Sequence, residues 1–243
     1  MGQERKPWRH RVADFGRDHT LIDNRRILDV LKREALKRHR FLQIGALDFV
    51  SFDPLVEFVN VREWTIDFVE PQPFYANLLR SRYVQFENVK VHELCVADAS
   101  GVKTLYYVDP DAVAKNLVPD WAAGIASLHL DRNALGGLGC SPVEFDLIKR
   151  HICSIDVRCE EVGEFLSRFS EEPPTIIWID IEGEDMSVVN ALDLNVNAPA
   201  IIKVEAINME DDDLESSFSK FSRNGYHVGF FDNDMVAIRT DLK

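Results

Sequence analysis

Short apolar runs alternate with helical stretches along most of this chain, and this alternation limits the possible folds more than any other feature. Two stretches have helical spacing, 73–83 and 186–192, and each lies between two apolar runs. Strands that alternate with helices predict a mostly parallel sheet covered by helices on both faces, which is a doubly wound α/β fold. The strand-like runs are 41–46, 64–69, 89–94, 175–181 and 200–206.

The end of the chain adds a hairpin to this pattern. Two strand-like runs, 226–230 and 235–239, flank Asp232-Asn233-Asp234, which is a turn sequence typical of β-hairpins. A helix is predicted before them at 214–223, and Gly225 is well placed to end it. A parallel sheet that finishes in an antiparallel hairpin is a specific architecture among α/β folds.

Residues 1–39 are expected to form a basic helical extension, and residues 40–243 the main domain. At 25–39, five apolar side chains follow helical spacing with basic residues between them, which predicts an amphipathic helix. Residues 1–40 hold 12 of the 28 Lys and Arg residues and 6 of the 41 acids, so they carry +6 and the rest carries −19. Such a segment suits a phosphorylated substrate, a membrane surface or an acidic partner, but packing on the chain's own acidic body is favoured. The five apolar residues are Ile27, Leu28, Leu31, Ala35 and Leu36.

The composition excludes several classes of protein. A net charge of −13 argues against broad nucleic-acid binding, which depends on neutralising phosphates. No run approaches the roughly 20 apolar residues of a membrane helix, and the charged first ten residues do not resemble a secretory signal. The four cysteines lack C-x-x-C spacing, so reduced thiols and a cytoplasmic location are expected. For the oligomeric state a homodimer is the default expectation.

Residues 109–150 are the least regular part of the chain, and they are rich in Gly, Ala, Asn and Pro. A long insertion between strands is typically a lid or a binding loop, and disordered decoration is the alternative. We favour a lid-like insertion, because it would lie near the strand ends where ligands bind.

Two signals for ligand binding stand at the ends of the first two predicted strands. Gly45 lets the backbone pass close to a ligand and leads into a turn. Glu70 follows 25 residues later, and an acid at the end of the second strand can accept hydrogen bonds from both ribose hydroxyls. An exposed acid at a strand end is the alternative for Glu70. The pair favours a nucleoside-containing cofactor.

A third signal lies at the end of the strand predicted at 175–181. Asp180 and Glu182 are two residues apart and share a face while the chain is extended, and Gly183 then permits a tight turn. Carboxylates at the tip of a central parallel strand face the ligand crevice. Glu184 and Asp185 are better explained as acids that favour a helix N-terminus.

Together these motifs resemble the FkbM family of methyltransferases, a branch of the class I S-adenosylmethionine-dependent fold. The resemblance extends over roughly residues 40–240, and its specificity lies in the order and spacing of the motifs. The segments that carry it are Ile44-Gly-Ala-Leu-Asp-Phe49, Asp53-Pro54, Val69-Glu-Pro-Gln-Pro73, Val96-Ala-Asp-Ala-Ser-Gly101, Ala126-Ser-Leu-His129, Val162-Gly-Glu-Phe-Leu166, Asp180-Ile-Glu-Gly-Glu-Asp185 and Gly225-Tyr226.

The resemblance implies a Rossmann-like, seven-stranded sheet whose last strand is antiparallel, with S-adenosylmethionine as cofactor. It implies that Gln43, Gly45 and Ala46 contact the methionine part, that Glu70 binds the ribose, and that the 95–97 segment lies beside the adenine. Enzymes of the family typically methylate hydroxyl groups on sugars, glycosides or polyketide-like products. The cofactor-binding residues expected are Gln43, Gly45, Ala46, Asp48, Glu70, Pro71, Cys95, Val96, Ala97 and Asp180.

Methylation of a hydroxyl needs an in-line approach and benefits from a general base. The candidates are Asp180, Glu182 and His129, although His129 is equally well explained as a surface histidine of the insertion. Glu205 either lines the acceptor pocket or is a satisfied buried acid. No zinc spacing is present. Magnesium is the minority alternative, with hard oxygen ligands from Asp180, Glu182, Asp185 and Glu205.

The leading hypothesis is therefore an O-methyltransferase that acts on a small saccharide or glycosylated metabolite. Phe49 departs from the pattern, because many class I enzymes have a glycine after the acid at position 48. Either the loop takes another path, or cofactor binding is weakened and the chain is a non-catalytic binding module. A nicotinamide-dependent oxidoreductase is the third hypothesis, against which the missing three-glycine fingerprint and the terminal hairpin both count.

Overall fold

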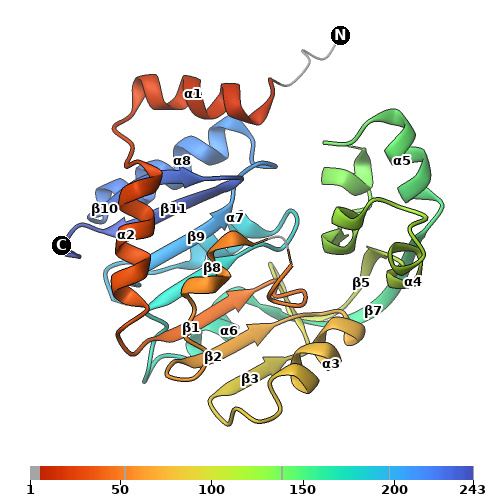
Figure 1. The fold of residues 1–243 in the computed structure, drawn as a ribbon, viewed down its shortest axis with the longest axis horizontal. Coiled ribbons are helices and arrows are strands. Elements are labelled where there is room, and N and C mark those ends of the chain that lie inside the picture. The colour runs from red at the N-terminus through yellow and green to blue at the C-terminus, as the bar shows by residue number, and fades with distance from the viewer. Residues whose placement is uncertain (1–5, 52, 138, 197, 243) are drawn as a thin grey trace.

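A seven-stranded sheet forms the centre of the computed structural model, which describes residues 6–51, 53–137, 139–196 and 198–242. The strand order is β10-β11-β9-β8-β1-β2-β3 (Figure 1). Only β11 runs antiparallel to its neighbours, β9 and β10. The predicted sheet with its antiparallel last strand is confirmed. The bounds are β1 Arg40–Ile44, β2 Thr65–Val69, β3 Val89–His92, β8 Ile176–Ile179, β9 Ile201–Glu205, β10 Tyr226–Phe231 and β11 Asp234–Arg239.

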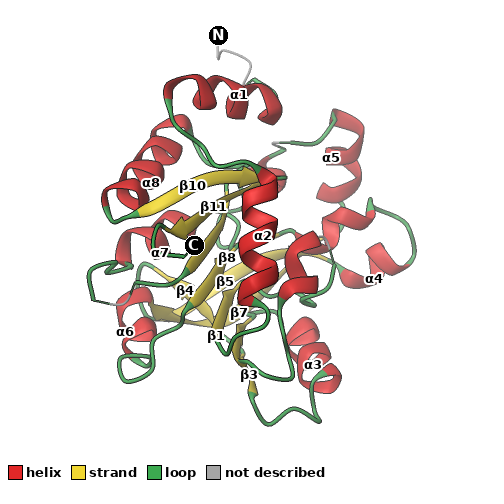
Figure 2. Cartoon of the chain, turned by 60° about the vertical axis from the view of Figure 1, so that its left-hand side comes forward, coloured by secondary structure: helices red, strands yellow, loops and turns green. Residues whose placement is uncertain are grey.

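Helices cover both faces of this sheet, as a doubly wound fold requires (Figure 2). Successive strand residues point to opposite faces, so Leu42 packs with α6, α7 and α8, whereas Phe41 packs with α2 and α3. None of the helices in the described part of the chain combines the length and apolarity needed to cross a bilayer. The helix bounds are α1 Trp8–Asp18, α2 Asn24–Glu34, α3 Pro73–Arg82, α6 Val162–Ser167, α7 Asp185–Ala191 and α8 Asp211–Arg223.

A second, four-stranded sheet, with the order β4-β7-β5-β6, was not predicted. The run expected as one strand at 89–94 ends at His92, and the chain then enters the second sheet, where β4 pairs in parallel with β7. Strands β5 and β7 pair antiparallel over eight residues and lead the chain away from the large sheet (Figure 1). The bounds are β4 Cys95–Ala97, β5 Gly101–Val108, β6 Ala126–Ser127 and β7 Ile152–Glu161.

The insertion predicted at 109–150 is folded, not disordered, although residue 138 lies outside the described residues. It holds the short helices α4 Pro110–Ala114 and α5 Pro142–Lys149 and the 3-10 turns η2 Asp120–Gly124 and η3 Asn133–Gly136. Its apolar side chains form a small core of their own, separate from that of the large sheet. Members of this core are Val108, Ala112, Val118, Ala122, Ile125, Leu135 and Ile148.

The basic N-terminal segment packs on the acidic remainder of the chain, which was the alternative that the sequence favoured. Arg11 is 7% exposed, and its guanidinium pairs with Asp211 at 2.9 Å and donates to the carbonyl oxygens of Ile207 and Met209. The helix predicted at 25–39 is too long. It ends at Glu34, so Leu36, which was expected in its apolar stripe, is 88% exposed.

Phe49 is accommodated by a left-handed backbone conformation in the loop after β1. The backbone adopts positive φ at Leu47 (45°) and at Phe49 (65°). This conformation turns the Phe49 ring into the core, where it is 4% exposed and its centroid lies 4.6 Å from that of Phe68 and 5.9 Å from that of Phe41. The ring therefore supports the loop after β1 from below.

This conformation predicts an unusual order of stabilities at position 49. Phe49→Ala should lower the free energy of unfolding by about 3–4 kcal/mol, because a buried ring is lost. Phe49→Gly should cost no more than Phe49→Ala, because glycine is favoured over alanine at positive φ by roughly 1 kcal/mol. Urea unfolding measures both changes.

The matched control is Phe221, which is fully buried inside α8. At a helical position the order is reversed, so Phe221→Gly should be about 1 kcal/mol less stable than Phe221→Ala. A glycine at position 49 that destabilises more than alanine would contradict the left-handed loop.

Candidate functional site

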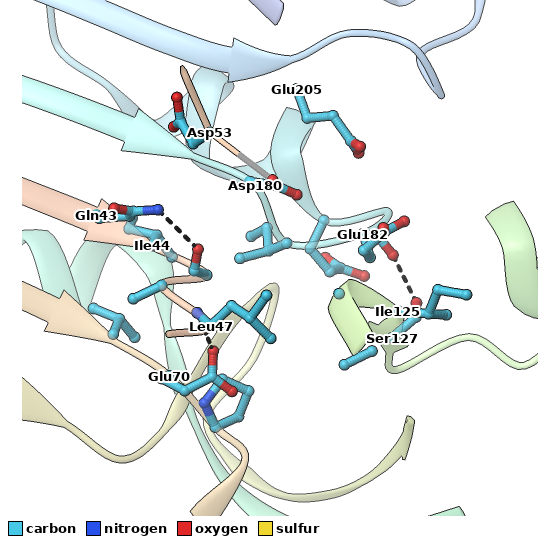
Figure 3. A pocket seen from close by; sticks show the side chains of 18 of the residues that line it. Gln43, Ile44, Leu47, Asp53, Glu70, Ile125, Ser127, Asp180, Glu182 and Glu205 are labelled. Atoms are coloured by element: carbon cyan, nitrogen blue, oxygen red, sulfur yellow. Dashed lines mark hydrogen bonds between the residues drawn. The ribbon is translucent and has the colours of Figure 1, made fainter. Parts of the chain in front are cut away.

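A cavity of about 560 Å³ lies beyond the carboxyl ends of β1, β2, β8 and β9. From β1 the sheet continues in one direction through β2 and in the other through β8, and the crevice at such a reversal is the usual ligand site of an open α/β sheet. Residues of the insertion form the facing wall (Figure 3). The strand-tip signals found in the sequence thus converge on one cavity.

Gly45 is required at the tip of β1 because two backbones meet there. Its φ is +81°, and a Cβ at this position would lie 1.6 Å from the carbonyl oxygen of Asp180. The neighbouring Gln43 is buried and donates from Nε2 to the Gly45 carbonyl oxygen at 3.3 Å. Its Oε1 is buried without a hydrogen-bond partner. Gln43, Gly45 and Ala46 all line the cavity.

Glu70 holds the β1 loop against the tip of β2. It is 3% exposed, and its two carboxylate oxygens accept from the backbone N–H groups of Leu47 and Gln72, each at 2.8 Å. Burial raises the pKa of Glu70 to about 7. Each oxygen keeps a further lone pair for a ligand hydroxyl. The alternative of an exposed strand-end acid is therefore wrong.

Not every expected cofactor residue reaches the cavity. Pro71, Cys95 and Val96 line it, whereas Ala97 packs in the core of the second sheet. The Asp48 carboxylate accepts from the backbone N–H groups of Val50 and Ser51 and from the Ser51 hydroxyl, so it shapes its own loop.

The four cysteines are free thiols, as predicted. Cys95 faces Cys159 across the β4–β7 pair. The contact between their thiols raises the pKa of Cys95 and lowers that of Cys159 to about 7.

Three carboxylates gather at the other end of the cavity, at the tips of β8 and β9 (Figure 3). Asp180, Glu182 and Glu205 each place one oxygen within 4.8 Å of the others. Burial raises the pKa of Asp180 to about 6 and that of Glu182 to about 8, and it raises the pKa of Glu205 well above its ordinary value. Such a group of oxygens suits a hydroxyl, a proton or a hard divalent cation.

Asp185 does not join this group, although it was considered as a fourth metal ligand. Its carboxylate accepts from the backbone N–H groups of Ile181 at 3.0 Å and Gly183 at 3.2 Å. It thereby holds the turn in which Glu182 adopts a φ of +49°. Asp185 has a structural role in aiming Glu182.

The insertion contacts this turn through several hydrogen bonds. Ser127 Oγ donates to the carbonyl oxygen of Glu182 at 2.7 Å, and Asn133 Nδ2 donates to the Glu182 carboxylate at 2.8 Å. His129 Nε2 lies 2.7 Å from the Glu184 carboxylate. His129 is thus beside the cavity but outside its lining, and Ser127 and Asn133 are contacts that the sequence analysis missed.

Lys203 was also missed, although a lysine inside the apolar run of β9 was an available signal. It is 3% exposed, and its Nζ lies 2.9 Å from carboxylate oxygens of both Asp53 and Asp234. Burial alone would lower the pKa of Lys203, but the carboxylates of Asp234, Asp53 and Asp180 outweigh it and raise that pKa. Lys203 thus ties the loop after β1 to the terminal hairpin.

Several solved structures are similar to this chain. The FkbM methyltransferase from Methylobacillus flagellatus KT is 15% identical, with a TM-score of 0.48 over 85% of this chain and 46% of that chain. This chain thus spans about half the length of that protein. Precorrin-6y C5,15-methyltransferase from Geobacter metallireducens GS-15 is 14% identical, with a TM-score of 0.39 over 90% and 91% of the two chains. Fibrillarin from Aeropyrum pernix, solved with natively bound S-adenosyl-L-methionine, is 9% identical, with a TM-score of 0.40 over 87% and 73%.

No curated protein matches this sequence. A family model described as the methyltransferase FkbM domain, in contrast, matches residues 43–228. This range begins at Gln43 at the tip of β1 and includes the insertion and the turn that carries Asp180 and Glu182. The match extends over more than half of the chain, which therefore belongs to the FkbM methyltransferase family.

Proposed function

We propose that the protein transfers the methyl group of S-adenosylmethionine to a hydroxyl group of a sugar, glycoside or related small metabolite. The observation that carries the proposal is one cavity with Glu70 on one side of the Gly45 turn and a carboxylate group on the other. The first side suits a ribose and the second suits a hydroxyl acceptor.

The residues present fit this cofactor. Gln43 leaves a buried acceptor oxygen unpaired at the cavity, and the ammonium group of the cofactor would satisfy it. Glu70 would hold the ribose and Cys95 and Val96 the adenine. Among the described residues that line the cavity, eight are acidic and one, Lys203, is basic, which favours a cationic ligand.

S-adenosylmethionine supplies the methyl group as an electrophile on a positively charged sulfur. The protein must orient the acceptor oxygen in line and remove its proton. Asp180, with a pKa of about 6, is ionised at neutral pH and can take that proton. Glu182, with a pKa of about 8, is mostly protonated there and can donate a hydrogen bond to the acceptor. The chain thus offers a base and a donor side by side.

Cofactor binding is the first test, because it separates this proposal from the two alternatives. S-adenosylhomocysteine should raise the unfolding temperature and give a saturable calorimetric isotherm, whereas NAD should do neither. Glu70→Gln should weaken S-adenosylhomocysteine binding about tenfold, because one charged acceptor is lost. Glu172→Gln, on the exposed side chain of a distant acid, is the control and should bind normally. Binding of NAD in place of S-adenosylhomocysteine would favour the oxidoreductase.

The pH dependence of methyl transfer tests the base. Because Asp180 acts only when ionised and Glu182 donates only when protonated, kcat/KM should rise as the pH increases through about 6 and fall again above about 8. Asp180→Asn should lower kcat at least about 100-fold while S-adenosylhomocysteine binding stays within a few fold. An unchanged pH profile in the Asn variant would remove Asp180 from this role.

The acceptor screen that finds the substrate should include sugars, nucleotide-sugars and glycosylated metabolites, each with and without magnesium. Asp180, Glu182 and Glu205 form the single set among the described residues with a geometry for a divalent cation. Activity that depends on magnesium in the wild type and is lost in Glu205→Gln would favour the metal-assisted alternative. Full activity in EDTA would favour the metal-free mechanism above.

A further inference from the structure

We propose that Trp121 forms the platform of the acceptor subsite, where the apolar face of a neutral sugar ring packs on the indole while the ring hydroxyls reach the carboxylates of β8 and β9. The inference rests on the proposed function and narrows its acceptor. In this proposal the insertion recognises the sugar, and the carboxylates at the strand tips take part in methyl transfer.

The two walls of the cavity differ in chemistry. The strand tips contribute the acidic wall with Asp180, Glu182 and Glu205. The insertion contributes a mostly apolar wall, in which Trp121 is the only aromatic residue among those that the structure describes. Sugar rings have the same division, with C–H bonds on a ring face and hydroxyls around its edge. The insertion residues of the wall are Trp121, Gly124, Ile125, Ala126, Ser127, Leu128, Ala134 and Gly139.

Trp121 is held in place but left uncovered. It lies in the turn η2, and the residue that follows it, Ala122, is fully buried in the core of the insertion. The Trp121 indole also lies near Glu144 of α5, an exposed carboxylate whose pKa is lowered mainly by hydrogen bonds from Ser141 and to a smaller extent by the indole N–H. The side chain nevertheless stays 37% exposed, and its ring stacks on no other aromatic ring of the described residues.

A fixed aromatic ring at a cavity wall suits ligand packing. A ligand that covers the exposed part of the Trp121 side chain removes apolar surface from water, which favours binding. Tryptophan also provides a large contact area with only two side-chain torsions to restrict. An exposed apolar side chain in a concave site with a few convergent polar groups is typical of small-molecule recognition.

The space beside Trp121 is open. A Cβ at Gly124, three residues further along the wall, would meet no atom within 4 Å, and its backbone does not have the positive φ that reserves a position for glycine. A larger residue at Gly124 would therefore enter this space without straining the loop. This gives a second, independent way to test the subsite.

The charges argue for a neutral acceptor. Lys203 is the only cation among the described lining residues, and Asp53 and Asp234 already pair with its Nζ. A phosphate or carboxylate on the acceptor would lose its hydration beside Asp180, Glu182 and Glu205 without gaining a counter-charge. Sugar phosphates and nucleotide-sugars are therefore disfavoured.

Tryptophan fluorescence tests the platform directly. The chain has four tryptophans. Trp64 and Trp178 are buried, and Trp8 of α1 is half-buried with its indole N–H donating to the carbonyl oxygen of Asp232. A change on adding sugar is therefore assigned to Trp121 by comparing the wild type with Trp121→Leu, which keeps the other three. With S-adenosylhomocysteine bound, a panel of methyl glycosides of neutral hexoses and pentoses should shift the emission to shorter wavelength for at least one member. The shift should vanish in Trp121→Leu, and the corresponding sugar phosphate should not produce it.

Kinetics with the responding sugar give the second readout. Trp121→Leu should raise KM at least tenfold and Trp121→Phe less than threefold, with S-adenosylhomocysteine affinity unchanged in both. Gly124→Leu should raise KM by filling the same space. Phe74→Leu is the matched control, because Phe74 is a 58% exposed aromatic residue outside the cavity lining, and it should behave as wild type.

The possible results distinguish a failure of the proposed function from a failure of the Trp121 platform. Wild-type protein that does not bind S-adenosylhomocysteine would refute the proposed function itself. Normal binding with no emission change for any glycoside, or with a change that persists in Trp121→Leu, would refute the platform alone. Stronger binding of sugar phosphates than of neutral sugars would refute the neutral acceptor.

Discussion

The contact between the tips of β1 and β8 is the constraint on which the site depends. At Gly45 the turn after β1 comes so close to the Asp180 carbonyl oxygen that no side chain fits between them. Both partners are backbone, so neither can move aside without shifting a central strand. The contact fixes Glu70, which holds the turn from one side, relative to Asp180 on the other. A ligand that touches both carboxylates must therefore cross this turn.

Much of the fold was predictable because local patterns determine it. Buried strands read as apolar runs, and Gly225 after α8 and the Asp232-Asn233 turn mark boundaries with local chemistry. The second sheet escaped prediction because β5 buries only two of its eight side chains and its partner β7 begins more than forty residues later. Phe49 shows a different limit, since a non-glycine residue can hold positive φ where its ring gains a buried site.

The part of the candidate site that was predicted from the sequence consists of acids at or just after the ends of strands. Glu70, Asp180, Glu182 and Glu205 lie at such ends, and the topology brings them to one edge of the sheet. What the sequence does not contain is the pairing between distant segments. It did not reveal that residues of the 127–133 segment hydrogen-bond to the turn after β8. It also did not reveal that Lys203 pairs with one acid in the loop after β1 and with another in the terminal hairpin. These pairings turn separate carboxylates into one organised cavity.

A crystal structure of the protein with S-adenosylhomocysteine tests the central claim most directly. The account predicts the nucleoside in this cavity, with its ribose hydroxyls on Glu70 and its amino-acid end at Gln43. The thioether sulfur should face the space between Asp180 and Trp121. An empty cavity at saturating S-adenosylhomocysteine, or a nucleoside bound elsewhere on the surface, would contradict it.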